Sequence, residues 1–134
     1  MTRILILCTG NSCRSKMAQA VLQHTDSKLI VCSAGTHPAK EVNPLAVRVM
    51  DEVNIPIADL QTHDVSEYEN QDWDYVITVC DNARETCPVF SGKVAHQLYI
   101  GCTDPAMATG SEDEKLSVFR KVRDEIIATF TKIE

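Results

Sequence analysis

The sequence is short of positive charge and has no internal repeat or long apolar run. Its 13 lysine and arginine residues stand against 19 aspartate and glutamate residues, so the formal net charge is −6. A general nucleic-acid-binding surface needs an excess of basic residues, and this balance argues against nucleic acid as a partner. The apolar run at residues 4–7 is too short for a signal-peptide core or a membrane span. We therefore expect neither a secreted protein nor a membrane protein.

The six cysteines and four histidines also lack the spacing of a zinc site. No Cys-x2-Cys pair and no clustered Cys-x-His pattern is present. An even cysteine count in a secreted chain would suggest a disulfide framework, but nothing here supports secretion. We expect a cytoplasmic protein, where thiols are kept reduced and grouped cysteines usually indicate metal binding or catalysis.

What the sequence does contain is typical of one α/β domain spanning residues 1–134. The chain is 44% hydrophobic and 24% charged, and its length suffices for a core without staples. Predicted strands and helices alternate along the chain, and this alternation predicts an open parallel sheet of about four strands with helices on both faces. Strands are predicted at 3–7, 29–35, 75–79 and 94–100, and helices at 15–24, from Asn43-Pro44 to about residue 54, and after Ser111.

The last helix has the clearest signals. Ser111 and Glu114 have the spacing of a capping box, in which each side chain bonds the other residue's backbone N–H. An apolar stripe then recurs every three or four residues, at Leu116, Phe119, Val122, Ile126, Phe130 and Ile133.

The segment 8–15, which we call the anion loop, joins the first strand to the first helix and predicts an oxyanion site. Its backbone N–H groups can converge on one tetrahedral anion, with Gly10 expected to supply a positive φ. The helix end and Arg14 would stabilise a Cys8 thiolate, to which Ser15 is placed to donate. The loop lacks the Gly-Lys-Ser/Thr of a Walker sequence and the glycines of a Rossmann fingerprint. The expected anion-binding residues are Thr9, Gly10, Asn11, Ser12, Cys13 and Arg14.

The anion loop, Cys-Thr-Gly-Asn-Ser-Cys-Arg-Ser, resembles the active-site loop of low-molecular-weight protein tyrosine phosphatases and of the arsenate reductases built on that fold. The likeness continues in Ser33-Ala34-Gly35, Asn43-Pro44 and Asp104-Pro105 and so covers nearly the whole chain. It implies that Cys8 is the nucleophile and Asp104 the general acid. The phosphatase branch usually has tyrosines after this aspartate, whereas this chain has Ala106-Met107.

Arsenate reduction needs a second thiol that attacks the first sulfur, and Cys80 follows a predicted parallel strand as Cys8 does. Both would then emerge at one edge of the sheet. The pattern Cys80, six residues, Cys87-Pro88 resembles the thioredoxin-coupled arsenate reductases. That resemblance implies a relay in which Cys80 attacks the Cys8–arsenic adduct and Cys87 attacks the Cys8–Cys80 disulfide. A helical 80–87 segment would hold its cysteines about 10 Å apart. A disulfide needs about 7 Å, so we expect oxidation to remodel residues 80–88.

The same resemblance sets the expected ligands and partners. The resemblance implies that arsenate is the substrate and that phosphate or sulfate competes with it. It also implies that the protein acts in arsenical resistance. Reduced thioredoxin supplies the electrons, no cofactor is bound, and we expect a monomer. Some relatives bind potassium near the loop through an early acidic residue of the first helix. Here Gln19 stands at that position beside Asn11 and Ser33, which argues against a tight potassium site.

Two other functions stay open. The chain could be a low-molecular-weight phosphatase acting through a cysteinyl-phosphate intermediate, with Cys80 and Cys87 regulatory or protective. It could also be a non-enzymatic redox-sensing or oxyanion-binding module. Residual phosphatase activity is compatible with arsenate reduction, because both chemistries use the loop and Asp104. The remaining cysteines, Cys13, Cys32 and Cys102, are expected only to pack.

Overall fold

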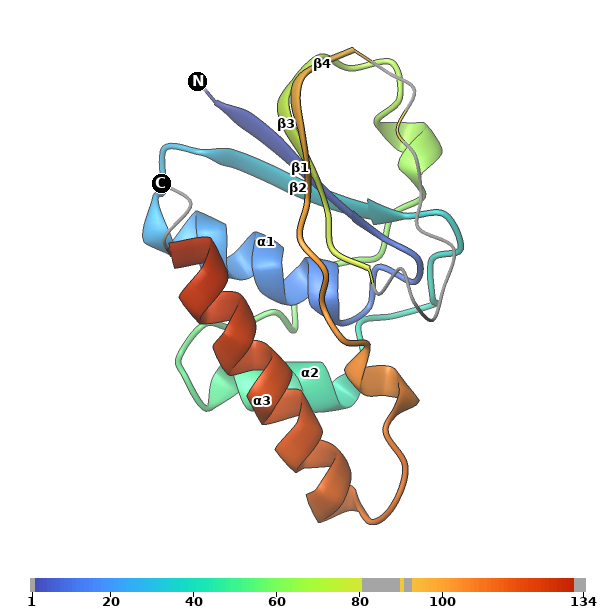
Figure 1. Ribbon diagram of the computed structural model, residues 1–134, viewed down its shortest axis with the longest axis vertical. Helices are drawn as coiled ribbons and strands as arrows, with labels where there is room; N and C mark the ends of the chain where they lie inside the picture. Colours follow the sequence, from blue (N-terminus) through green and yellow to red (C-terminus); the bar gives the residue numbers. More distant parts are fainter. Residues whose placement is uncertain (1, 81–89, 91–92, 132–134) are drawn as a thin grey trace.

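The computed structural model describes residues 2–80, 90 and 93–131 and contains one sheet of four parallel strands (Figure 1). The strand order is β2-β1-β3-β4, which confirms the predicted open parallel α/β architecture. All four strands lie within two residues of their expected bounds. They are β1 Arg3–Cys8, β2 Ile30–Gly35, β3 Trp73–Thr78 and β4 Val94–Tyr99.

The strand order reverses at β1, which is flanked by β2 on one side and β3 on the other. In open parallel sheets, such a reversal leaves a crevice beyond the carboxyl ends of the central strands. Cys8 ends β1, and Leu7 is paired with Thr78 of β3. The anion loop therefore begins at the position where this fold binds ligands.

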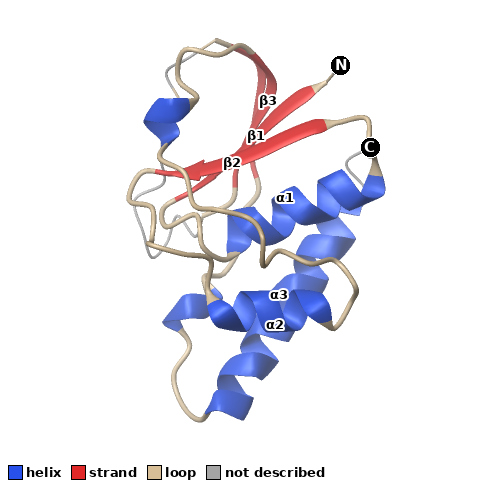
Figure 2. Cartoon of the chain, turned by 180° about the vertical axis from the view of Figure 1, so that it is seen from behind, coloured by secondary structure: helices blue, strands red, loops and turns tan. Residues whose placement is uncertain are grey.

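All three α-helices pack on the same side of the sheet, as both views show (Figures 1 and 2). Ile4 and Ile6 face the helices, and Leu5 and Leu7 face the opposite layer. That layer includes Trp73 and Val76 of the sheet, against which Val65 and Tyr68 pack. Among the described residues, one face of the sheet is thus covered by the three α-helices, and the other face is covered by the 3-10 turn η1. The helices are α1 Arg14–Thr25, α2 Pro44–Asp51 and α3 Glu112–Thr131, with 3-10 turns η1 Val65–Glu67 and η2 Pro105–Met107.

Two helix starts follow the predicted capping chemistry. The Asn43 side chain accepts a hydrogen bond from Leu45 N at 2.9 Å, with Pro44 in the first turn of α2. Glu114 N donates to Ser111 Oγ at 3.2 Å, and Ser111 N donates back to the Glu114 carboxylate. The apolar stripe of α3 is buried as expected at Leu116, Phe119, Val122, Ile126 and Phe130, and Ile133 lies outside the described residues.

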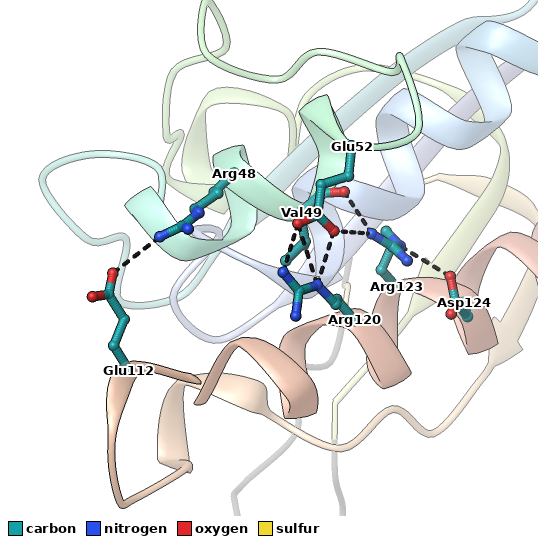
Figure 3. A network of polar contacts seen from close by, with 7 residues as sticks. All are labelled: Arg48, Val49, Glu52, Glu112, Arg120, Arg123 and Asp124. Atoms are coloured by element: carbon teal, nitrogen blue, oxygen red, sulfur yellow. Dashed lines mark hydrogen bonds and ion pairs between the residues drawn. The ribbon is translucent and has the colours of Figure 1, made fainter. Parts of the chain in front are cut away.

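An ion-pair network fixes α3 against the end of α2 (Figure 3). The Glu52 carboxylate accepts from Arg120 at 2.8 Å and from Arg123 at 2.8 Å. Arg123 is nearly buried and also donates to the Val49 carbonyl. These two arginines hold the pKa of Glu52 down at about 2, chiefly through the hydrogen bond from Arg120. The network therefore ties the end of α2 to the middle of α3.

Within the described part of the chain, no helix combines the length and the apolar character needed to cross a bilayer.

Candidate active site

The anion loop surrounds a small cavity at the start of α1. Its volume of about 40 Å³ exceeds the roughly 10–15 Å³ that one water needs. The cavity can therefore hold an anionic group of a few atoms. It is lined by Cys8, Gly10, Asn11, Ser12, Cys13, Arg14, Asp104 and Ala106. All of the predicted anion-binding residues except Thr9 are in this lining. Thr9 lies in the chain between Cys8 and Gly10, which both line the cavity.

Segment 36–43 holds the carbonyl groups of the loop on its outer side. His37 N donates to the Thr9 carbonyl at 3.0 Å, and Ala39 N donates to the Gly10 carbonyl at 2.9 Å. In a planar trans peptide the following N–H points away from the C=O. The N–H groups of Gly10 and Asn11 therefore turn to the inner side, which is the arrangement that binds an anion.

Gly35 allows β2 to approach the loop closely. A Cβ at this position would lie 2.3 Å from the Thr9 carbonyl oxygen and 3.1 Å from Asn11 N. Both are closer than real Cβ atoms comfortably approach backbone, so only glycine fits here. The Ser33-Ala34-Gly35 sequence is thus part of the frame of the site.

The Cys8 sulfur is buried and receives two polar contacts. Asn11 N donates to Cys8 Sγ at 3.1 Å, and Ser15 Oγ lies 3.0 Å from the same sulfur. Donors directed at sulfur stabilise a thiolate over a thiol, and the thiolate is the nucleophilic form. These contacts lie where the predicted nucleophile Cys8 and its predicted donor Ser15 need them, and their catalytic roles stay a prediction.

Asn11 determines which way the Ser15 hydroxyl donates. His63 N donates to Asn11 Oδ1 at 2.8 Å, which identifies the oxygen of that amide. Its Nδ2 then donates to Ser15 Oγ at 2.7 Å and to Ser33 Oγ at 2.9 Å. Because the Ser15 oxygen already accepts, its own hydrogen is free to point at Cys8.

The positive φ of the loop is at Asn11, with φ of 51°, and not at Gly10 as expected. Asparagine tolerates the left-handed region better than most residues because its short polar side chain can bond locally. Here the side chain makes two buried hydrogen bonds and one partly buried hydrogen bond, which offset the strain.

Arg14 and Asp104 bring opposite charges to the cavity from distant parts of the sequence. Arg14 is 3% exposed, and its Nη2 lies 3.5 Å from Asp104 Oδ2. Its Nη1 donates to the Cys102 carbonyl at 3.3 Å. Ala106 N donates to the other Asp104 oxygen at 3.0 Å. The guanidinium can bind an oxyanion, and the carboxyl group is placed to protonate a leaving oxygen.

Cys80 lies at the same sheet edge as Cys8, as expected. Val79 N donates to the Leu7 carbonyl at 2.8 Å, so the register places Val79 beside Cys8 and Cys80 one residue beyond. Cys80 is buried and disulfide-bonded, whereas four other cysteines are free. Cys87 lies outside the described residues, as does most of the segment expected to be remodelled by oxidation.

The other free cysteines are poor nucleophiles. Burial raises the pKa of Cys13 to about 12 and that of Cys102 to about 11, and it also raises the pKa of Cys32. All three are therefore thiols near neutral pH. Cys13 lines the cavity but also packs in the core, in keeping with the expected packing role.

A buried cation that the sequence did not reveal is Lys16, which is 1% exposed at the start of α1. Its Nζ donates to Gln19 Oε1 at 3.4 Å, an oxygen that also accepts from Ser33 Oγ at 2.5 Å. One sequence signal was available, because residues 16, 19 and 23 share a helix face. In the structure Gln19 donates to the Val31 carbonyl of β2, and Gln23 donates to the carbonyl of Leu29, just before β2. That pattern indicates a polar face packed on the sheet.

The oxygens around Gln19 do not fit a potassium ion. Gln19 is neutral, its oxygen is occupied by Lys16 and Ser33, and a cation there would adjoin the Lys16 ammonium. Among the residues described, no group of three or more histidine, cysteine or acidic side chains could hold another metal.

Comparisons with known proteins place this geometry in a family. Residues 3–133 match the model of the low molecular weight phosphotyrosine protein phosphatases. The chain is 42% identical over 131 residues to an arsenate reductase of Shouchella clausii strain KSM-K16, covering 96% of this chain and 92% of that protein.

Two solved structures are similar as well. An arsenate reductase in its phosphate-binding state is 27% identical, with a TM-score of 0.79 over 97% of this chain and 94% of that one. A thioredoxin-dependent arsenate reductase of Corynebacterium glutamicum is 26% identical, with a TM-score of 0.59 over all of this chain and 64% of that one.

Proposed function

The chain belongs to the low molecular weight phosphotyrosine protein phosphatase family, and on that premise we propose that it is a thioredoxin-coupled arsenate reductase. The observation that carries the proposal is the placement of two cysteines, Cys8 and Cys80, at the ends of adjacent parallel strands. A hydrolase needs only the first of them. The 42% identity to an arsenate reductase supports the same choice.

The reaction begins in the anion cavity. Loop N–H groups and Arg14 bind arsenate, and the Cys8 thiolate attacks the arsenic atom. Asp104 gives its proton to the departing oxygen, which leaves as water. Ser15 donates to the sulfur before the attack and keeps it nucleophilic. The product is a covalent Cys8–arsenic adduct.

The electrons come from the thiols of the chain. The Cys80 thiolate attacks the Cys8 sulfur and forms a Cys8–Cys80 disulfide. The S–As bond breaks with its electron pair on arsenic, which leaves as arsenite, so two electrons pass from sulfur to arsenic. The Cys87 thiolate then attacks Cys80, releases Cys8 as a thiolate and leaves a Cys80–Cys87 disulfide. Two thiols of thioredoxin reduce that disulfide.

Weak phosphatase activity accompanies this reaction in our proposal, because phosphate fits the same cavity and water can hydrolyse a thiophosphate. The cavity favours a small anion over an aryl phosphate. Ala106 lines it and Met107 is 65% exposed, at the positions where the phosphatase branch usually has tyrosines. Aryl substrates therefore lack their aromatic partner here.

We also propose that the enzyme works as a cytoplasmic monomer without a bound cofactor. Its activity should depend only weakly on potassium, because the Gln19 side-chain oxygen already accepts from Lys16 and Ser33.

Arsenite release with thioredoxin, thioredoxin reductase and NADPH tests the proposal. Cys87→Ser is expected to abolish multiple turnover, because the Cys8–Cys80 disulfide is then not passed outward. Cys32→Ser is the matched control, since Cys32 lies on β2 away from the cavity lining, and it should turn over like the wild type. Full turnover by Cys87→Ser, or none by the wild type, would contradict the relay.

A further inference from the structure

Lys16 is a buried cation close to the nucleophile. Its side chain is 1% exposed, and its ammonium has one hydrogen-bond acceptor among the described contacts, Gln19 Oε1. Burying an ammonium is costly unless an anion compensates for it. Burial lowers the pKa of Lys16 to about 8, so the group is still mainly protonated at neutral pH. A buried positive charge of this kind requires a nearby negative one.

Three titratable groups act on Lys16 from the elements around it: Cys8 of β1, Cys32 of β2 and Glu67 of η1. Cys32 is a thiol at neutral pH because burial raises its pKa. Glu67 is exposed and already accepts from His63 and from Asp64 N. Cys8 is buried, as Lys16 is, so in its nucleophilic thiolate form it is the partner of Lys16 that solvent screens least.

A continuous chain of hydrogen bonds joins the two groups. Gln19 Oε1 accepts from both Lys16 and Ser33, and Ser33 Oγ accepts from Asn11. Asn11 Nδ2 also donates to Ser15, which contacts the Cys8 sulfur. Every link is buried or partly buried, so water screens the charges little.

We propose that Lys16 is a positioning residue whose ammonium is a second internal counter-charge of the Cys8 thiolate, acting through Gln19, Ser33, Asn11 and Ser15. It adds to Arg14, which lines the Cys8 cavity together with the opposing Asp104 carboxylate. The proposal deepens the proposed function, since it concerns the nucleophile of that reaction. The thiolate is then ready for arsenate without any added ion.

The test measures the pH dependence of Cys8 alkylation by iodoacetamide, followed by peptide mass spectrometry without arsenate. Lys16→Met removes the charge and keeps the apolar stem. Lys16→Gln also removes the charge but can still donate to Gln19. Lys121→Met is the control, because Lys121 is exposed on α3.

Both uncharged Lys16 variants should raise the pH midpoint of alkylation by about one unit, a roughly tenfold loss of reactive thiolate near neutral pH. The Lys121 variant should match the wild type. Unchanged midpoints in folded Lys16 variants would overturn the proposal.

A second measurement uses the wild-type sequence and needs no folded variant. Linkage requires that blocking Cys8 with a neutral carboxamidomethyl group lowers the NMR titration midpoint of the Lys16 ammonium, because its counter-charge is lost. An unchanged midpoint would overturn the proposal. Neither readout involves arsenite, so arsenate reduction can fail while this inference holds, and the reverse.

Discussion

At the residue scale, the site depends on one asparagine more than on any glycine. Asn11 has a positive φ, bonds three partners through its side chain and donates its backbone N–H to Cys8. The sequence predicts Asn11 in the anion loop but predicts the left-handed conformation at Gly10. The prediction for Gly10 rests only on the conformational freedom of glycine. In the structure, the side-chain hydrogen bonds of Asn11 hold the left-handed conformation at Asn11 instead.

Comparing Asn11→Ala with Asn11→Gly separates these two contributions. Both variants lose the three side-chain hydrogen bonds, each contributing about 1 kcal/mol to the free energy of unfolding. Only alanine also meets the left-handed penalty of about 1–2 kcal/mol. Urea denaturation should therefore find Asn11→Ala less stable than Asn11→Gly by about 1 kcal/mol. Equal stabilities would show that the φ at this position carries no strain.

Buried cations are the residues that the sequence could not reveal. Lys16 and Arg123 are both charged, yet they are 1% and 8% exposed. A charged residue on a helix is normally expected at the surface, because burial depends on partners that are distant in sequence. Arg123 bonds Glu52, 71 positions away. The acceptor of Lys16, Gln19 Oε1, is only three positions away, but that oxygen also accepts from Ser33 of β2, 14 positions from Gln19.

At the element scale, the sequence predicts what is local. The caps at Asn43 and Ser111, the stripe of α3 and the four strands depend on neighbouring residues, and the structure confirms them. The turn η1 was not predicted, although Asp64 and Glu67 form a capping box that signals it. Which face each helix covers could not be predicted, since that is decided by packing between distant segments.

The contact between α2 and α3 gives a pH prediction. The folded pKa of Glu52 is about 2, below its ordinary 4.5, so its ion pairs stabilise the fold above pH 4.5. This contribution is lost as pH falls from 4.5 through 2. Glu52→Gln should lower the unfolding temperature at neutral pH, and the difference from wild type should shrink across that window.

The matched control for that experiment is Glu69→Gln, because Glu69 is an exposed acidic residue on the loop before β3. Its effect should be small and should not change over the same pH range. A Glu52→Gln difference that persists unchanged at acid pH would show that the carboxylate charge does not hold α2 to α3.

At the scale of the whole molecule, the chain has an excess of acidic residues and yet contains one local site that can bind an anion. The net charge is −6, yet loop N–H groups, Arg14 and Lys16 gather positive charge at the end of β1. The fold places this site where the strand order reverses, and it brings Cys80 to the same edge. Phosphate-ester hydrolysis and arsenate reduction can both use this anion site, and they differ in whether the second cysteine takes part.

The most direct test of that use is a single turnover without any external reductant. Fully reduced protein is mixed with excess arsenate, and arsenite and remaining thiols are counted together. The account predicts about one arsenite released and about two thiols lost per chain, because two sulfurs supply the two electrons. No arsenite, with every thiol retained, would contradict it.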